Sequence, residues 1–268
     1  MHVVIRTGST AILEYETLRD VIDVALWAGQ MLLQNGADSQ RVEETVHRIG
    51  TGLGCNWMDI FVSPNAIVVT TISGDDFRTK IRRIVRIGVN MHLIDAVNSI
   101  SRRVEIGELD RFQLRAELEK LDALPHNYHR WTVVAMVGLA CAAFARLFGG
   151  DFPVMAITFA ASSTAMYVRQ ELNRRFFNSF LVVIVTALIA GLIASLATRY
   201  NIGKEPQIAL AASVLLLVPG VPLINAAEDV INGYVVMGLV RGVTGGIIAL
   251  CIALGLLIAM RLMGVEGL

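Results

Sequence analysis

The sequence contains few of the residue patterns that familiar chemistry requires. Its three cysteines, Cys55, Cys141 and Cys251, form no CxxC pair, and we interpret them as small buried hydrophobic residues. There is no Walker loop, GxSxG, HExxH or paired-cysteine metal motif. We therefore expect no catalytic residues, no bound metal and no cofactor, and we predict that the protein is not an enzyme.

Charge is scarce and is unevenly distributed. The 268 residues have no net charge and only 17% are Asp, Glu, Lys or Arg. No part has the basic excess that nucleic-acid binding requires, so that class of partner is excluded. Of 23 basic and 23 acidic residues, 15 and 17 respectively lie up to Arg130. The part after Arg130 has too little charge to cover a water-soluble surface, and the sequence predicts an integral membrane protein with a soluble N-terminal half.

The start of the chain has no apolar run long enough for an export signal, because Arg6, Glu14 and Glu16 interrupt it. We treat residues 1–17 as an N-terminal extension and expect the domain that follows, residues 18–125, to be cytoplasmic.

Periodicity within residues 18–125 predicts an α+β domain. Apolar residues recur at helical spacing in 18–35, after Asp38, around Ile94–Val104 and around Leu114–Leu121. Residues 57–63 and 65–72 are rich in β-branched and aromatic residues, and 77–87 is a possible third strand. This third strand would place Arg78, Lys80, Arg82 and Arg86 on one face, either solvated or attracting an anionic substrate or lipid.

The remaining residues, 126–268, predict an all-α transmembrane domain. Most of the hydrophobic segments approach the ~20 residues that cross a bilayer, and we expect five spans at 131–148, 153–168, 180–198, 207–227 and 236–263. With a cytoplasmic N-terminus, an odd number of spans puts the C-terminus outside. The loop with Arg169, Arg174 and Arg175 then lies inside, as the positive-inside rule prefers, whereas Arg199 and Lys204 lie outside.

The fourth segment contains a predicted break. Pro219 and Pro222 each lack a backbone donor and obstruct the preceding turn, and Gly220 between them tolerates unusual backbone geometry. A helix broken at membrane depth is tolerated only inside protein or beside a wet cavity, and such breaks form substrate and ion sites in many transporters. A simple proline kink is the alternative.

Polar residues follow the break. Asn225 and Asp229 are one helical turn apart, and a carboxylate at this point is a candidate carrier for a proton or an ion. The alternative is that Asp229 is a solvated loop charge. Arg241, at the start of the fifth segment, would pair with Asp229, hold an anionic substrate or extend to the membrane interface.

The second segment contributes Ser162, Ser163, Thr164 and Arg169. The three hydroxyl groups would line a pathway or allow close helix packing. For Gly238 and Gly242 of the fifth segment, close packing is the stronger interpretation.

Several blocks of the sequence together resemble the threonine/serine exporter (ThrE-like) family. The blocks are LLLVPGVPLINAAEDVINGYVVMGLVRG from Leu215, NGADSQRVEETVHRIGTGLG from Asn35, SPNAIVVTTIS from Ser63, GVNMH from Gly88 and STAMYVRQ from Ser163. The resemblance is greatest to the YjjP-like large subunits. The family motif falls on Pro219, Gly220, Pro222, Asn225, Asp229, Gly233, Gly238 and Arg241.

The resemblance implies a function in the bacterial inner membrane. It implies an ion-gradient-driven exporter of small carboxylates such as succinate, with protons or another ion as the coupling species. A small five-span YjjB-like subunit would supply the second half of the pathway, and we expect a higher oligomer. A threonine/serine exporter is one alternative, and a membrane-anchored sensor or enzyme with its activity in residues 18–122 is another.

Overall fold

The computed structural model describes residues 15–73, 76–85, 88–123 and 128–265. By their internal contacts the residues divide into two compact units. The first comprises residues 1–125 and 221–242, and the second comprises residues 126–220 and 243–268. The hydrophobic periodicity of the sequence does not predict the grouping of residues 221–242 with the N-terminal part.

The first unit is built around one central helix. Val21, Ala25, Ala28 and Leu32 of this helix have almost no exposed surface, as expected for the apolar face of a helix at the centre of a domain. In chain order the elements are α1 (Tyr15–Gln34), α2 (Ser39–Gly52), β1 (Trp57–Ser63), β2 (Ala66–Ser73), β3 (Asp76–Arg83), α3 (Met91–Glu105) and α4 (Arg111–Asp122). The central helix, α1, contacts three other helices, α2, α3 and α4, and two strands of the sheet.

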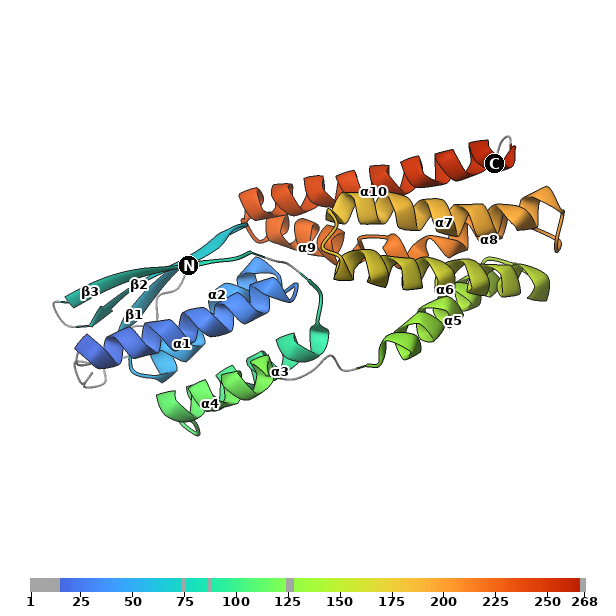
Figure 1. Ribbon diagram of the computed structural model, residues 1–268. Coiled ribbons are helices and arrows are strands. Elements are labelled where there is room, and N and C mark those ends of the chain that lie inside the picture. Colours follow the sequence, from blue (N-terminus) through green and yellow to red (C-terminus); the bar gives the residue numbers. More distant parts are fainter. Residues whose placement is uncertain (1–14, 74–75, 86–87, 124–127, 266–268) are drawn as a thin grey trace. The chain divides into compact units, whose positions relative to one another are not determined.

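The three strands form an antiparallel meander in the order β1–β2–β3. Inward-facing residues such as Met58, Val62, Ile67 and Val69 alternate with outward-facing ones, as the period of two of a half-buried strand requires. The inward face packs on α1 and α2, which follow the strands on one side in Figure 1. The predicted α+β organisation is thus present, although the third strand ends at Arg83 instead of residue 87.

A helical hairpin completes the first unit. It consists of α9 (Gly220–Ile231) and the first turns of α10 (Val235–Met263). Gly233 has φ +89° and ends α9 in the left-handed conformation that glycine adopts most easily. Met237 belongs to the same hydrophobic cluster as α1 and α2, and Tyr234 packs against that cluster.

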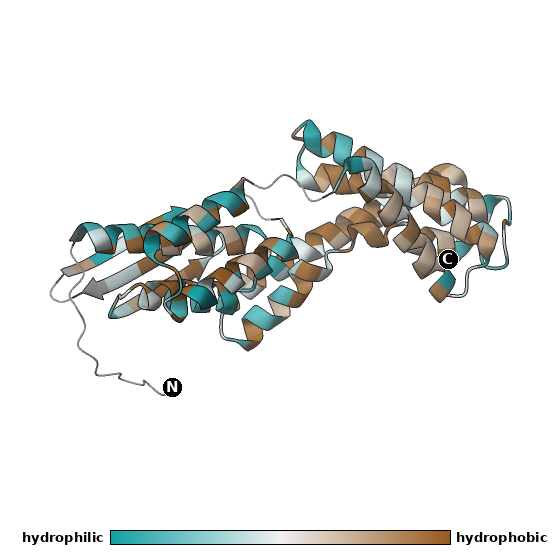
Figure 2. Ribbon diagram, turned by 90° about the horizontal axis from the view of Figure 1, so that it is seen from below, coloured by the Kyte–Doolittle hydropathy of each residue, from teal (hydrophilic) through white to brown (hydrophobic). Residues whose placement is uncertain are grey.

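The second unit is entirely helical in its described residues and is strongly apolar. Its elements are α5 (Arg130–Leu147), α6 (Phe152–Arg174), α7 (Ser179–Arg199), α8 (Gln207–Ser213), the 3-10 helix η1 (Leu215–Leu217) and the remainder of α10. Hydrophobic residues dominate these helices in Figure 2, whereas hydrophilic residues are frequent in the first unit.

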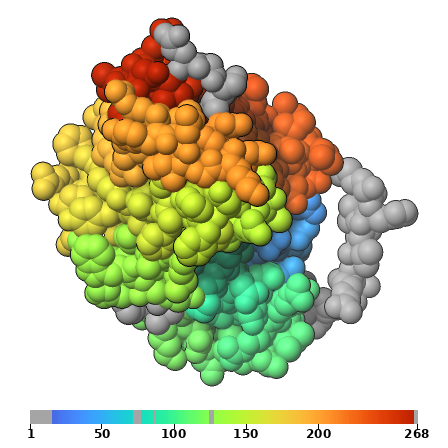
Figure 3. All heavy atoms as spheres, turned by 90° about the vertical axis from the view of Figure 1, so that its right-hand side faces the viewer, coloured from blue at the N-terminus to red at the C-terminus, as the bar shows by residue number. Residues whose placement is uncertain are grey.

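Small residues allow the helices of the second unit to approach closely. One buried cluster consists largely of alanines, among them Ala145, Ala161, Ala194 and Ala209. The space-filling view in Figure 3 shows α8, in orange, packed against α6, in yellow-green. Such small-residue interfaces are typical of helices that associate in a membrane.

Three described helices, α5, α7 and α10, are long and apolar enough to cross a membrane. A fourth candidate results if α8–η1 and α9 together count as one broken span. The predicted second span lies in α6, which continues beyond residue 168 to Arg174 and includes several charged residues. Helix length and composition therefore support a membrane protein, while the five spans remain a prediction.

The break in the fourth segment is present, but only one proline accounts for it. The helical residues stop at Leu217 and resume at Gly220, on either side of Val218 and Pro219. Pro222 lies in the first turn of α9. The prediction that Pro222 also breaks the helix is wrong, because a first-turn residue needs no amide donor for an intrahelical hydrogen bond.

Gly238 provides a test of the hairpin's packing. A Cβ atom on this residue would lie 2.6 Å from the carbonyl oxygen of Ala226 and 2.5 Å from Cγ2 of Val230. We expect Gly238→Ala to cost about 1–3 kcal/mol through overpacking, measured as reduced thermal stability of the purified chain in detergent. Gly242→Ala is the matched control, since its Cβ would meet only Ala226 at 3.8 Å. Equal stability of the two variants would contradict the close approach of α9 and α10.

Candidate functional site: a buried ion pair in the α9–α10 hairpin

The centre of the site is an ion pair between the two helices of the hairpin. Arg241 Nη1 of α10 lies 2.9 Å from Asp229 Oδ2 of α9. The side chain of Asp229 is 1% exposed and that of Arg241 is 10% exposed. Asp229 is therefore not a solvated loop charge, and of the three roles considered for Arg241 the structure shows the pairing with Asp229.

The ion pair also binds the turn between α1 and α2. The backbone amide of Ser39 donates a hydrogen bond to Asp229 Oδ1 at 2.9 Å. Arg241 Nη2 donates to the carbonyl oxygen of Ala37 at 2.7 Å. Each charge thus has its ionic partner and a backbone group as well, which reduces the cost of burying both of them.

Asp229 lies at the N-terminus of α2, where a negative charge is favourable. The first backbone amides of a helix have no intrahelical acceptor, and the helix dipole is positive at that end. Asp38, the N-cap residue, accepts a hydrogen bond from the Arg41 amide, and Asp229 accepts one from Ser39. Asp38 and Asp229 thus both provide acceptors for the first backbone amides of α2.

Two further polar contacts hold the hairpin in place. Asn225 Nδ2 donates to the carbonyl oxygen of Gly36 at 2.7 Å. The hydroxyl of Tyr234 donates to Glu43 Oε2 at 2.6 Å. Burial, followed by this hydrogen bond and the negative charge of Glu43, raises the pKa of Tyr234 above its usual range, so the phenol remains a donor at physiological pH.

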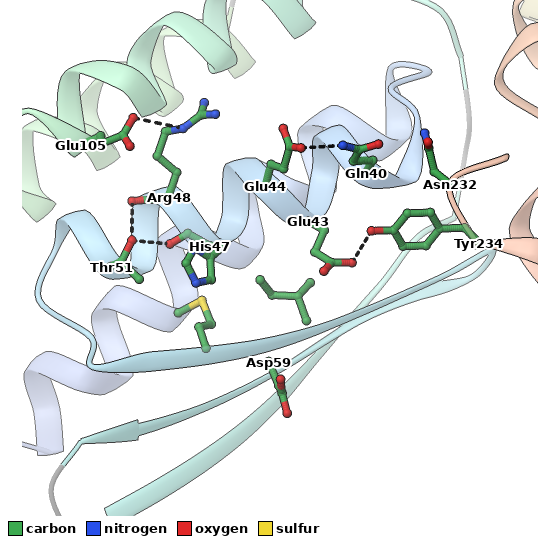
Figure 4. A pocket seen from close by; sticks show the side chains of 12 residues that line it. Gln40, Glu43, Glu44, His47, Arg48, Thr51, Asp59, Glu105, Asn232 and Tyr234 are labelled. Atoms are coloured by element: carbon green, nitrogen blue, oxygen red, sulfur yellow. Dashed lines mark hydrogen bonds and ion pairs between the residues drawn. The ribbon is translucent and has the colours of Figure 1, made fainter. Parts of the chain in front are cut away.

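Figure 4 shows an open polar pocket next to the Tyr234–Glu43 hydrogen bond, with a volume of about 730 Å³. Side chains of α2, β1, α3 and the turn after α9 line it. Glu43, Glu44 and Glu105 contribute carboxylates, and Arg48 of the same lining pairs with Glu105. The Asp59 side chain points to the other side of β1 in Figure 4. A lining of this sign suits an amine or a hydroxyl better than a second carboxylate.

The predicted polar residues of α6 lie in the second unit, where two of them bind the end of the broken helix. Ser162 Oγ donates to the Ser213 carbonyl oxygen at 3.2 Å. Arg169 Nη1 donates to the Leu216 carbonyl oxygen at 3.0 Å. These carbonyls belong to the last turns before Pro219, where the intrahelical donors are missing. Both side chains therefore satisfy acceptors that the break leaves free.

The other two α6 residues do not share this role. Ser163 faces α5, where a Cβ on Gly138 would lie only 2.0 Å from its Oγ atom, so the position serves close packing. Thr164 is exposed on the surface of the chain. Of the ten predicted site residues, the structure thus joins Asn225, Asp229 and Arg241 at the α1–α2 turn, and separately joins Ser162 and Arg169 at the break.

The described residues provide no alternative chemical centre. No three His, Cys, Asp or Glu side chains among them are close enough to hold a metal ion. Burial raises the pKa of the Cys55 thiol, which disfavours the reactive thiolate.

Periodicity does not reveal the residues that bind the hairpin, namely Gly36, Ala37, Ser39 and Glu43, nor the role of Tyr234 within it. Three of their contacts are to backbone groups, which no side-chain pattern reveals. One signal was available: residues 35–54 and 215–242 are both blocks of the family resemblance. The structure shows that these two blocks contact each other.

The ion pair predicts an asymmetric response to mutation. Asp229→Ala leaves Arg241 buried without its ionic partner, and we expect a loss of about 3–5 kcal/mol in stability. A double variant, Asp229→Leu with Arg241→Met, should lose less than the sum of the two single changes. Thermal unfolding in detergent measures both effects, with Glu228→Ala, at the exposed neighbouring carboxylate, as the control. Strict additivity would show that the two charges do not interact.

Comparison with known proteins identifies relatives along most of the chain. Residues 23–263 match the family model described as "Putative threonine/serine exporter". A protein from Escherichia coli named "Probable succinate transporter subunit YjjP" is 38% identical over 95% of this chain and 99% of its own length. A protein of the same name from Klebsiella aerogenes is also 38% identical, over 93% and 96%.

A more distant relative is longer than this chain. The "Threonine/serine exporter" of Corynebacterium glutamicum is 23% identical over 88% of this chain, but only 51% of that protein is covered. No solved structure matches. The extent of the family match and the identity to the two subunits show that the chain belongs to the threonine/serine exporter family of membrane transporters.

Proposed function

We propose that this chain is the large subunit of an ion-gradient-driven exporter of small dicarboxylates such as succinate. The observation that carries the proposal is the 38% identity, over nearly the full length of both proteins, to a chain named as a succinate transporter subunit. In this proposal residues 18–125 lie in the cytoplasm, and residues 126–268 cross the bacterial inner membrane five times and end outside.

The proposal includes a small five-span partner of the YjjB-like kind. The word "subunit" in the names of the two similar proteins supports an assembly of more than one chain. Coverage supports it as well, because this chain aligns with only about half of the long threonine/serine exporter. Those long proteins contain a second part that the partner would provide here.

Arg169 is the residue that we assign to the substrate carboxylate. Its guanidinium binds one carbonyl oxygen at the helix break, and no ion pair joins it to a carboxylate in the described part of the chain. Arginine presents several donors in a planar fork that matches a carboxylate. A half-buried cation without an acidic partner, next to a broken helix, has the chemistry of an anion site.

The pocket of the first unit is a poorer place for a dicarboxylate. Its lining includes the carboxylates of Glu43, Glu44 and Glu105, which would repel a dianion. Arg241 is also unsuited to bind substrate while it is paired with Asp229. These two observations favour the region of Arg169 for substrate recognition.

Asp229 is the proposed coupling residue. Protonation would remove the negative charge that balances Arg241 and would weaken the acceptor of the Ser39 amide. Proton uptake would then favour release of the hairpin from the α1–α2 turn. In this proposal the transported ion acts on the position of α9, which begins immediately after the break.

The proposed activity is tested by measuring efflux from cells without their own dicarboxylate exporters. Cells that contain both subunits should release succinate faster than cells with either subunit alone. Threonine and serine, measured in the same cells, distinguish the amino-acid exporter from the dicarboxylate exporter. Succinate efflux by this chain alone would overturn the two-subunit proposal, and efflux of threonine without succinate would overturn the proposed substrate class.

The role of Arg169 is tested separately. Arg169→Gln should lower succinate efflux by at least tenfold at an unchanged amount of protein in the membrane, because loss of a charged hydrogen bond costs about 1.5–3 kcal/mol. Arg169→Lys should retain part of the activity. The control is Arg174→Gln, five residues further along the same helix at an exposed position. Normal efflux by Arg169→Gln would remove this residue from substrate binding.

A further inference from the structure

One apolar face of the sheet in the first unit is not covered by any described residue. Trp57, Phe61, Phe77 and Ile81 project from the side opposite α1 and α2, and they are 47%, 67%, 76% and 64% exposed. Isolated exposed apolar residues are common, but several large exposed apolar side chains on one face of a sheet mark an interaction surface. We call these four residues the outer apolar group.

The strand register arranges this face in rows. Trp57 and Phe77 belong to one row across the sheet, and Phe61 and Ile81 belong to another. Between them lies a polar row of Asp59, Thr70 and Thr79. The hydroxyls of Thr70 and Thr79 are hydrogen-bonded to each other at 2.8 Å, so these two groups tolerate burial.

The charges of the face argue against a lipid surface. Strand β3 is strongly basic, but Arg78, Lys80 and Arg82 alternate onto the inward side, where Lys80 forms an ion pair with Asp23 of α1. The outer face carries Asp59 and Arg83, which balance each other. Surfaces that bind anionic membranes combine apolar residues with an excess of positive charge, and the described side chains of this face have no such excess.

We propose that the outer face of the sheet binds the same face of a second copy of this chain, around a two-fold axis parallel to the strands. Such an axis places β1 of one copy over β3 of the other. Trp57 then packs on the partner's Phe77 and Phe61 packs on the partner's Ile81. Asp59 lies opposite the partner's Thr79, whose hydroxyl is a suitable hydrogen-bonding group.

Electrostatics select this axis over the other face-to-face arrangement. A two-fold axis across the strands would place Asp59 directly opposite its own copy, and like charges in direct opposition are destabilising. With the axis along the strands, the two carboxylates are separated by the width of the sheet. The face is therefore self-complementary in only one of the two orientations, as an isologous interface requires.

The area is sufficient for a specific contact. With about 150–250 Å² for each aromatic side chain, the outer apolar group exposes roughly 500 Å² per copy. Two copies would bury about 1,000 Å² from these side chains alone, which is the lower limit for a biological interface. The polar row and the ends of the strands add to this area, at the ~10 Å spacing typical of packed sheets.

Cross-linking of the full-length chain in membranes tests the proposal. Thr70 lies on the proposed axis, so Thr70→Cys should give dimers with a short bifunctional thiol reagent, at a yield well above that of the unaltered chain. In the Asp59→Cys variant, the introduced cysteines of the two chains should not be cross-linked to each other. Adding Ile81→Glu should reduce the Thr70→Cys dimer at least tenfold, because it places a charge in the apolar contact.

The matched control is Ile106→Glu, at an isoleucine of similar exposure (70%) at the end of α3, which should leave the yield unchanged. Three results would overturn the proposal: no Thr70→Cys dimer above background, efficient cross-linking to a different protein, or quenching of Trp57 fluorescence by brominated lipids. Preferential dimerisation of Asp59→Cys would overturn the proposed axis.

Discussion

The arrangement of the first unit depends on the buried contact of Asp229 with Arg241. Moving two opposite charges out of water costs a large desolvation free energy for each of them, and their mutual attraction alone seldom compensates for this cost. Here the α1–α2 turn supplies the missing compensation: the Ser39 amide donates to Asp229, and the Ala37 carbonyl accepts from Arg241. The pair is stable only where that turn is present, so the hairpin and the turn specify each other's position.

The same dependence explains why α9 belongs with the N-terminal elements. The residues that form these contacts are about 190 positions apart in the sequence. Apolar packing of Met237 and Tyr234 supports the hairpin, but apolar contacts are not directional. The charged and amide hydrogen bonds set the register, which is the best-attested role of buried polar groups.

The sequence predicted those features that depend on local pattern. Helical spacing and β-branched runs identified the α+β domain, and Pro219 identified the break. The prediction that Pro222 breaks the helix was wrong because the effect of a proline depends on its position in the helix, which periodicity does not show. The partners of Asp229 were not predictable either: Ser39 and Ala37 contribute backbone groups, and every residue has those. Arg241 was proposed as one partner because charge complementarity is visible in a sequence.

The helix break at Val218 and Pro219 separates two sets of hydrogen-bonded groups. Before Pro219, the free carbonyls of Ser213 and Leu216 are bound by Ser162 and Arg169 of α6. After it, Asn225 and Asp229 of α9 are bound by the α1–α2 turn. A continuous helix would join these two sets of contacts rigidly through its backbone hydrogen bonds. Because the helical hydrogen bonds are interrupted at Val218 and Pro219, the residues on each side of the break are held by their own partners.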